Sequence, residues 1–129
     1  MKRGTVIFWK NFSFDDGDKS DKLLVVVGNG IDGRLLMLKT TSQPRAHWAN
    51  LDGCHSDASV FRLRQYLGGF RNPTWIQFDP PIIRTPQQVI DSAALPLFEL
   101  KLDDLHAVVD CYRKSPEISD VLIAFLHGP

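Results

Sequence analysis

Residues suited to contacting a nucleic acid lie in two short segments of the sequence. Arg45, His47 and Trp48 bring together a positive charge, a titratable ring and a large aromatic face. Such a group can stack on bases and contact phosphate. Arg62 and Arg64 alternate with apolar residues, which predicts that both side chains project from one face of a half-buried strand. The alternative for the first segment is a loop that Trp48 pins against the fold, with Arg45 in solvent.

A cluster of three glycines lies at residues 28–33. Glycine-rich turns of this kind can hold a phosphate, but a phosphate-binding loop opens directly into a helix. Here Arg34 is followed by four apolar residues and then by Lys-Thr-Thr, which is typical of a strand. The cluster therefore predicts a hairpin turn and not a phosphate site.

The composition limits the class of protein. A chain of 129 residues predicts a single domain over residues 1–129, and its 15 basic and 15 acidic residues give no net charge. Neutrality argues mildly against a dedicated nucleic-acid binder but allows a local basic patch.

The apolar run at residues 6–9 is too short for a signal peptide, and no run approaches the roughly 18 residues of a membrane span, so we expect a cytoplasmic protein. Cys54 and Cys111 fit no metal or redox spacing, and we expect no metal or other cofactor.

Strands dominate the first two thirds of the chain. Residues 5–9 and 23–27 are β-type runs joined by a charged loop with Asp-Asp-Gly at its turn, which predicts an N-terminal hairpin. The unbroken apolar run at residues 23–27 predicts a strand that is covered on both faces. An irregular loop is expected over residues 42–59. The remaining expected strands are residues 35–38, 60–64, 74–79, which Pro80-Pro81 ends, and 82–84.

Helical patterns follow in the last third. Residues 85–88 have the form of a capping box with proline at the first helical position, which predicts a short helix. Residues 103–114 place apolar side chains at helical spacing. Residues 115–117, Ser-Pro-Glu, predict the cap and first turn of a second helix with an apolar face. Strands followed by helices favour an α+β fold, in which the helices pack on an open side of a small barrel.

The opening of the chain resembles the PemK/MazF family of toxin ribonucleases. Residues 5–27 hold a strand, then Phe-x-Phe, an acidic-glycine loop with Lys-Ser, and a basic residue before a β-branched run. The family begins with a similar hairpin and continues with Arg-Pro before an apolar strand. Lys22-Leu23 stands at that position here, so both members of the pair have changed.

Two later segments carry the same resemblance. Residues 36–42 are similar to the third strand of the family, which ends in Pro-x-Thr-Thr or Pro-x-Thr-Ser. Thr40 falls on the family's functional threonine, and Leu38 replaces the proline. Residues 74–79 are similar to a later strand that ends in an acidic residue facing the active site, which is Asp79 here. The resemblance thus covers most of the chain in the right order.

This resemblance implies a fold and an activity. The fold would be an SH3-like β-barrel of about five to seven strands with C-terminal helices packed against it. The activity would be that of a type II toxin, a metal-independent endoribonuclease that cuts single-stranded RNA with the ribose 2′-hydroxyl as nucleophile. In that reaction Thr40 would donate a hydrogen bond to the scissile phosphate, Lys22 would offset its charge and Asp79 would be the base. Further charge or the acid would come from Arg62, Arg64 or His47.

The resemblance also implies partners, and it leaves an alternative function open. A small acidic antitoxin and a homodimer are expected, with the C-terminal helices or residues 35–38 at the dimer contact. The alternative is a catalytically impaired PemK/MazF-like fold that acts as a protein- or RNA-binding module near Trp48 and Trp75. The change from Arg-Pro to Lys-Leu favours this alternative, because an ammonium is a point charge whereas a guanidinium grips phosphate with two parallel hydrogen bonds.

Overall fold

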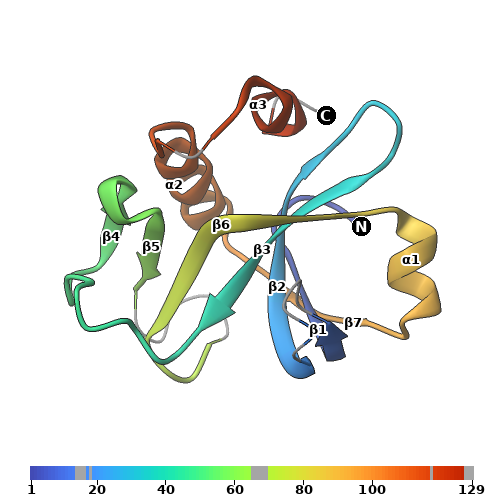
Figure 1. Cartoon of the computed structure of the whole chain (residues 1–129), viewed down its shortest axis with the longest axis horizontal. Coiled ribbons are helices and arrows are strands. Elements are labelled where there is room, and N and C mark those ends of the chain that lie inside the picture. The colour runs from blue at the N-terminus through green and yellow to red at the C-terminus, as the bar shows by residue number, and fades with distance from the viewer. Residues whose placement is uncertain (14–16, 18, 65–69, 117, 127–129) are drawn as a thin grey trace.

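The computed structural model describes residues 1–13, 17, 19–64, 70–116 and 118–126. Over this part of the chain it shows one antiparallel sheet of seven strands, three α-helices and a short 3₁₀ helix (Figure 1). The strands are β1 (Thr5–Ser13), β2 (Lys19–Asn29), β3 (Leu35–Thr41), β4 (Gly53–His55), β5 (Val60–Leu63), β6 (Thr74–Arg84) and β7 (Leu95–Glu99). The helices are α1 (Pro86–Asp91), α2 (Leu102–Arg113), α3 (Asp120–Leu126) and the 3₁₀ helix η1 (Ser56–Ala58). None of the described helices is long and apolar enough to cross a membrane.

The strand order is β4-β5-β6-β3-β2-β1-β7, which leaves β4 and β7 at the edges. The predicted α+β fold is confirmed. The sheet is not closed into a barrel, so the SH3-like closure expected from the resemblance is not confirmed. Strand β7 was not predicted from the sequence. It contains Pro96, which lacks the amide that a central strand needs but is tolerated at a sheet edge.

The centre of the sheet is buried on both faces. Val25 and Val27 of β2 belong to a cluster with the buried side chains of α2 and α3. Leu24 and Val26 point the other way, into a cluster that includes Val89 of α1. All four β2 side chains are fully buried, so the prediction that this strand is covered on both faces is confirmed. The turn of the first hairpin, which was expected at Asp-Asp-Gly, lies largely outside the described residues.

Strand β6 is longer than the sequence predicted. It pairs with β3 along two segments separated by a register shift, and the pair Pro80-Pro81 falls between those segments. A missing proline amide removes no ladder hydrogen bond at such an irregularity. The prediction that these prolines end the strand is therefore wrong, and the expected short strand at residues 82–84 is the second half of β6.

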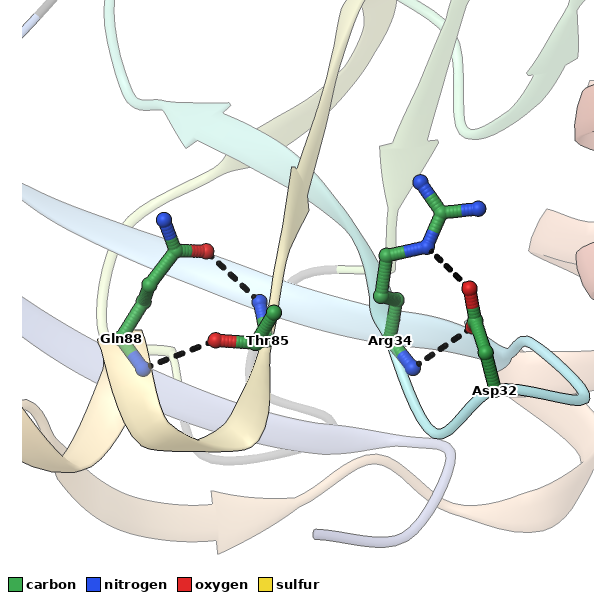
Figure 2. Close-up of polar contacts among 4 residues, drawn as sticks. All are labelled: Asp32, Arg34, Thr85 and Gln88. Atoms are coloured by element: carbon green, nitrogen blue, oxygen red, sulfur yellow. Dashed lines mark hydrogen bonds and ion pairs between the residues drawn. The ribbon is translucent and has the colours of Figure 1, made fainter.

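The irregular loop is also shorter than expected. Residues 42–59 contain the strand β4, which pairs with the following strand β5. The helix η1 lies between these two strands. The glycine cluster at residues 28–33 forms the β2–β3 hairpin turn, as predicted, with Gly30 N donating to Arg34 O at 2.8 Å. At this turn the carboxylate of Asp32 accepts from the backbone amide of Arg34 at 3.1 Å and from its Nε at 2.6 Å (Figure 2). The amide and then the guanidinium hydrogen bond lower the pKa of Asp32.

Two of the three helices begin close to where their sequence signals lie. At α1 the Thr85 hydroxyl accepts from Gln88 N at 3.1 Å, and the Gln88 side chain accepts from Thr85 N at 2.8 Å (Figure 2). This reciprocal pair is the predicted capping box. Helix α2 lies within one residue of its predicted bounds. Helix α3 begins at Asp120 and not near Ser115. The Ser119 hydroxyl accepts from Leu122 N at 3.3 Å at the helix start, whereas the Ser115 hydroxyl bonds with that of Ser59 at 2.9 Å.

The fold also joins the two cysteines. A disulfide connects Cys54 of β4 to Cys111 of α2, 57 residues apart in sequence. The sequence interpretation found no redox spacing for this pair. Spacing rules apply to residues close in sequence, whereas this pair meets because α2 packs beside β4.

We predict that Gly28→Ala destabilises the protein by about 1–3 kcal/mol through overpacking. An added Cβ at residue 28 would lie 2.4 Å from the backbone oxygen of Phe125, so helix α3 must shift. Gly30→Ala is the comparison variant and should cost less, because its added Cβ would meet the exposed side chain of Asp32 at 2.8 Å and the Phe125 ring at 3.0 Å and no backbone atom among the three nearest. Urea unfolding of both variants measures the difference. Equal losses of stability in the two variants would contradict the prediction that close packing of α3 on β2 sets the cost at residue 28.

Candidate functional site

A cavity of about 530 Å³ lies where β2 and β6 begin and β3 ends. Antiparallel pairing brings these strand ends to the same place in the sheet. Its wall includes the edge-to-face pair Phe70 and Phe98, whose ring centroids are 5.1 Å apart. Two of the predicted catalytic residues, Lys22 and Thr40, line it. The described lining residues are Asp21, Lys22, Leu23, Thr40, Thr41, Ser42, Gln43, Phe70, Arg71, Asn72, Thr74, Leu97 and Phe98.

Thr40 is buried, and its hydroxyl already has a partner. Its Oγ1 donates to the backbone oxygen of Leu23 at 2.9 Å. The hydroxyl proton is therefore used within the β2–β3 pair, whereas the oxygen can still accept a hydrogen bond. The predicted donation from Thr40 to a phosphate would require this bond to Leu23 to break.

The charges at the cavity come from Lys22, Arg71 and Asp21. Lys22 is half-buried, whereas Arg71 is exposed and forms no ion pair within the part of the chain that the structure describes. The Asp21 carboxylate accepts from Asn11 N at 2.9 Å. Arg71 and Asp21 were missed from the sequence. The available signal for Arg71 was its place beside Phe70, just before the Asn-Pro turn that leads into β6.

Asp79 is not part of this cavity as the structure describes it. It is exposed on β6 and lies near Tyr112 of α2. Burial raises the pKa of the Tyr112 hydroxyl to about 12, and the negative charge of Asp79 adds to the effect. The three predicted catalytic residues are therefore not gathered at one point, and the carboxylate that accompanies Lys22 and Thr40 is that of Asp21.

The two arginines of the predicted basic face, Arg62 and Arg64, are each engaged within the fold. Arg62 forms an ion pair with Asp52 and lies over the ring of Trp75, with its Cζ 5.0 Å from the ring centroid. Arg64 lies beyond the end of β5 and donates to Asp104 of α2 at 2.8 Å. Each guanidinium is thus neutralised by a separate carboxylate.

The group Arg45, His47 and Trp48 lies in the segment between β3 and β4. Arg45 approaches the Trp48 ring, with its Cζ 5.9 Å from the centroid, and His47 meets the same ring edge-on at 6.2 Å. Trp48 is half-buried, while Arg45 and His47 are exposed. None of the three lines the cavity, although the same segment begins with two cavity residues, Ser42 and Gln43. No cluster of three or more metal-ligating side chains occurs among the described residues.

We predict that Tyr112→Phe protects the protein against alkali. The Tyr112 hydroxyl is buried without a hydrogen-bond partner among the described residues, so its removal leaves stability at pH 7 nearly unchanged. Because its pKa rises from about 10 when unfolded to about 12 when folded, the unfolded chain loses this proton first and stability falls from pH 10 to 12. Urea unfolding across this range should show a shallower fall in the variant. Parallel curves would refute the assignment.

Comparison with known proteins identifies no relative: no family model, no curated protein and no solved structure matches this chain.

Proposed function

We propose that this protein binds single-stranded RNA at the cavity formed by the ends of β2, β3 and β6. The observation that carries the proposal is the meeting of Lys22 and Arg71 with the aromatic pair Phe70 and Phe98 in one hollow. Proteins that bind single strands combine positive charge for the backbone with aromatic side chains for the bases. The cavity supplies both within about 530 Å³, a volume in the usual range for ligand sites.

The other lining residues support the same ligand. Gln43 and Asn72 carry side-chain amides, which donate and accept hydrogen bonds as base edges require. Arg71 forms no ion pair with the described residues, so within this part of the chain its guanidinium can meet a phosphate at little cost. A neutral chain can still bind RNA in this way, because only the charge near the ligand matters at physiological salt.

This function corresponds to the binding-module alternative of the PemK/MazF resemblance. In this proposal the open seven-stranded sheet is a variant of the small SH3-like barrel of that family. Lys22 and Thr40 then position RNA instead of cutting it. Two features support binding over cleavage: the Thr40 hydroxyl is committed to Leu23 O, and Asp79 lies outside the cavity.

Metal-independent cleavage of the bound RNA is a second candidate function. The observation that favours it is that a cation, a hydroxyl and a carboxylate share the cavity: Lys22, Thr40 and Asp21. A carboxylate in reach of a ribose 2′-hydroxyl can act as the base, and a nearby ammonium can stabilise the charge that develops on the phosphate. In this candidate Asp21 takes the role that the sequence assigned to Asp79.

The remaining proposals concern partners and location. A small acidic antitoxin would compete with RNA for the cations Lys22 and Arg71. A homodimer cannot form through residues 35–38, because β3 lies in the middle of the sheet and these side chains are buried. Exposed Val121 of α3 keeps the C-terminal helices available for that contact. We also propose that the protein is located in the cytoplasm.

We predict that the double variant Lys22→Ala/Arg71→Ala binds a mixed-sequence single-stranded RNA at least tenfold more weakly than the wild type. Removal of two phosphate contacts should also reduce the slope of log affinity against log salt by about 0.7 per contact. Lys10→Ala/Lys101→Ala is the matched control, because it removes two exposed lysines outside the cavity. Fluorescence anisotropy in a salt series measures both quantities. Equal losses in the two variants would mean that the cavity is not the binding site.

The cleavage candidate makes a separate prediction. If the cavity cuts RNA, the wild type should cleave a long RNA in EDTA, and Asp21→Asn should slow cleavage by on the order of 100-fold or more as a general base is lost. Asp79→Asn is the matched carboxylate control and should cleave like the wild type. Gel analysis of the products distinguishes the cases. A wild type that binds but does not cut RNA eliminates this candidate and keeps the binding function.

A further inference from the structure

The segment of residues 42–55 contributes no buried side chain to the hydrophobic core. None of its side chains is buried, and only Trp48, Gly53 and His55 are partly covered. The segment ends in β4, an edge strand of three residues. Segments with few buried apolar contacts open at low cost in free energy. Some other interaction must therefore hold β4 in place.

That interaction is the disulfide. Cys54 of β4 is bonded to Cys111 of α2, which is 1% exposed and part of the main hydrophobic cluster. Among the described residues, the other links from the segment to the rest of the fold include the β4–β5 ladder of three residue pairs, the ion pair of Asp52 with Arg62, and the hydrogen bond from Gln43 N to Thr41 Oγ1 of β3 at 3.1 Å. The hydrogen bond between His55 Nε2 and Leu51 O, at 2.6 Å, lies within the segment itself.

The two cysteines differ in exposure. Cys54 is exposed, whereas Cys111 is buried in the main hydrophobic cluster. An incoming thiolate therefore reaches the Cys54 sulfur. It forms a mixed disulfide there, and Cys111 leaves as a thiolate that takes up a proton. The second thiol of a dithiol reductant then displaces Cys54, so the dithiol is oxidised to its disulfide and both cysteines end as thiols.

The surroundings of Cys111 can accommodate a free thiol after reduction. The Cys111 sulfur lies 3.9 Å from the backbone oxygen of Val60, so the thiol has an acceptor without any rearrangement. Strand β5 keeps its pairing with β6 and its own buried side chains, Val60, Phe61 and Leu63. Reduction thus removes the anchor of β4 but leaves the cluster around Cys111 intact.

We propose that the Cys54–Cys111 disulfide is a redox-sensitive restraint on residues 42–55, which reduction by a dithiol releases from α2. This segment begins with Ser42 and Gln43, which line the cavity, and the restraint adds to the bond from Gln43 N to Thr41 Oγ1 (3.1 Å) in ordering this wall. For its effect on RNA, the inference rests on the proposed function. Intracellular disulfides in ordinary cells are mostly transient or redox-sensing, which fits such a role in a cytoplasmic protein.

The test is hydrogen–deuterium exchange of the full chain, oxidised and after reduction with dithiothreitol. Amides in peptides covering residues 42–55 should exchange at least tenfold faster after reduction, while those of β3 stay unchanged. Cys54→Ser should match the reduced wild type without reductant, since this exposed position tolerates serine. Asp52→Ala is the matched control that breaks the ion pair with Arg62, and it should retain the slow exchange of the wild type in peptides that cover β4. Exchange within twofold between the two redox states would overturn the proposal.

RNA binding by the same two samples gives the second readout. The reduced protein should bind single-stranded RNA roughly 2–10-fold more weakly, because binding must then order the cavity wall. Equal affinity in both states, with faster exchange on reduction, would confine the restraint to the segment and overturn its link to the cavity. If neither state binds RNA, the proposed function fails, and the exchange rates still decide on the restraint.

Discussion

The pairing of β2 with β3 in the middle of the sheet is the constraint on which the rest of the structure depends. Both strands are apolar on both faces, and their central side chains are almost fully buried. A sheet with such strands at its centre must be covered on each side. Helices α2 and α3 supply the cover on one side and α1 contributes on the other, so the C-terminal helices are required by the strand composition. The close approach of Phe125 to Gly28 is one consequence of this packing.

The cavity forms at the ends of β2 and β3 where their side chains are no longer part of the covered core. At the start of β2 and the end of β3 the side chains change from apolar to charged and hydroxyl-bearing, and β6 begins beside them. Polar side chains at this end therefore face a hollow and not the core. The register of the β2–β3 pair sets Thr40 against Leu23, which is why the threonine hydroxyl is bound to backbone at the edge of the cavity.

The edge of the sheet at β4 has a different basis of stability. The central strands are held by burial, whereas β4 contributes no buried side chain and is fixed to α2 by a covalent bond. The ion pairs of Arg62 and Arg64 with Asp52 and Asp104 lie in the same part of the fold. Each of these pairs neutralises its own charge and joins two segments of the fold. At the cavity, Arg71 has no ion pair among the residues that the structure describes.

Local patterns of the sequence determined the elements that depend on neighbouring residues. The doubly buried strand at residues 23–27, the glycine turn at residues 28–33, the capping box at Thr85 and the span of α2 were all predicted, because hydrophobic period, φ angle and capping are properties of a few adjacent residues. The tertiary structure alone decided the open sheet, the continuation of β6 through Pro80-Pro81 and the late start of α3. It also decided the site: Lys22, Thr40, Asp21 and Arg71 meet, Asp79 does not join them, and Cys54 finds Cys111. Strand register and helix packing set those contacts, and both are properties of the whole chain that no short segment encodes.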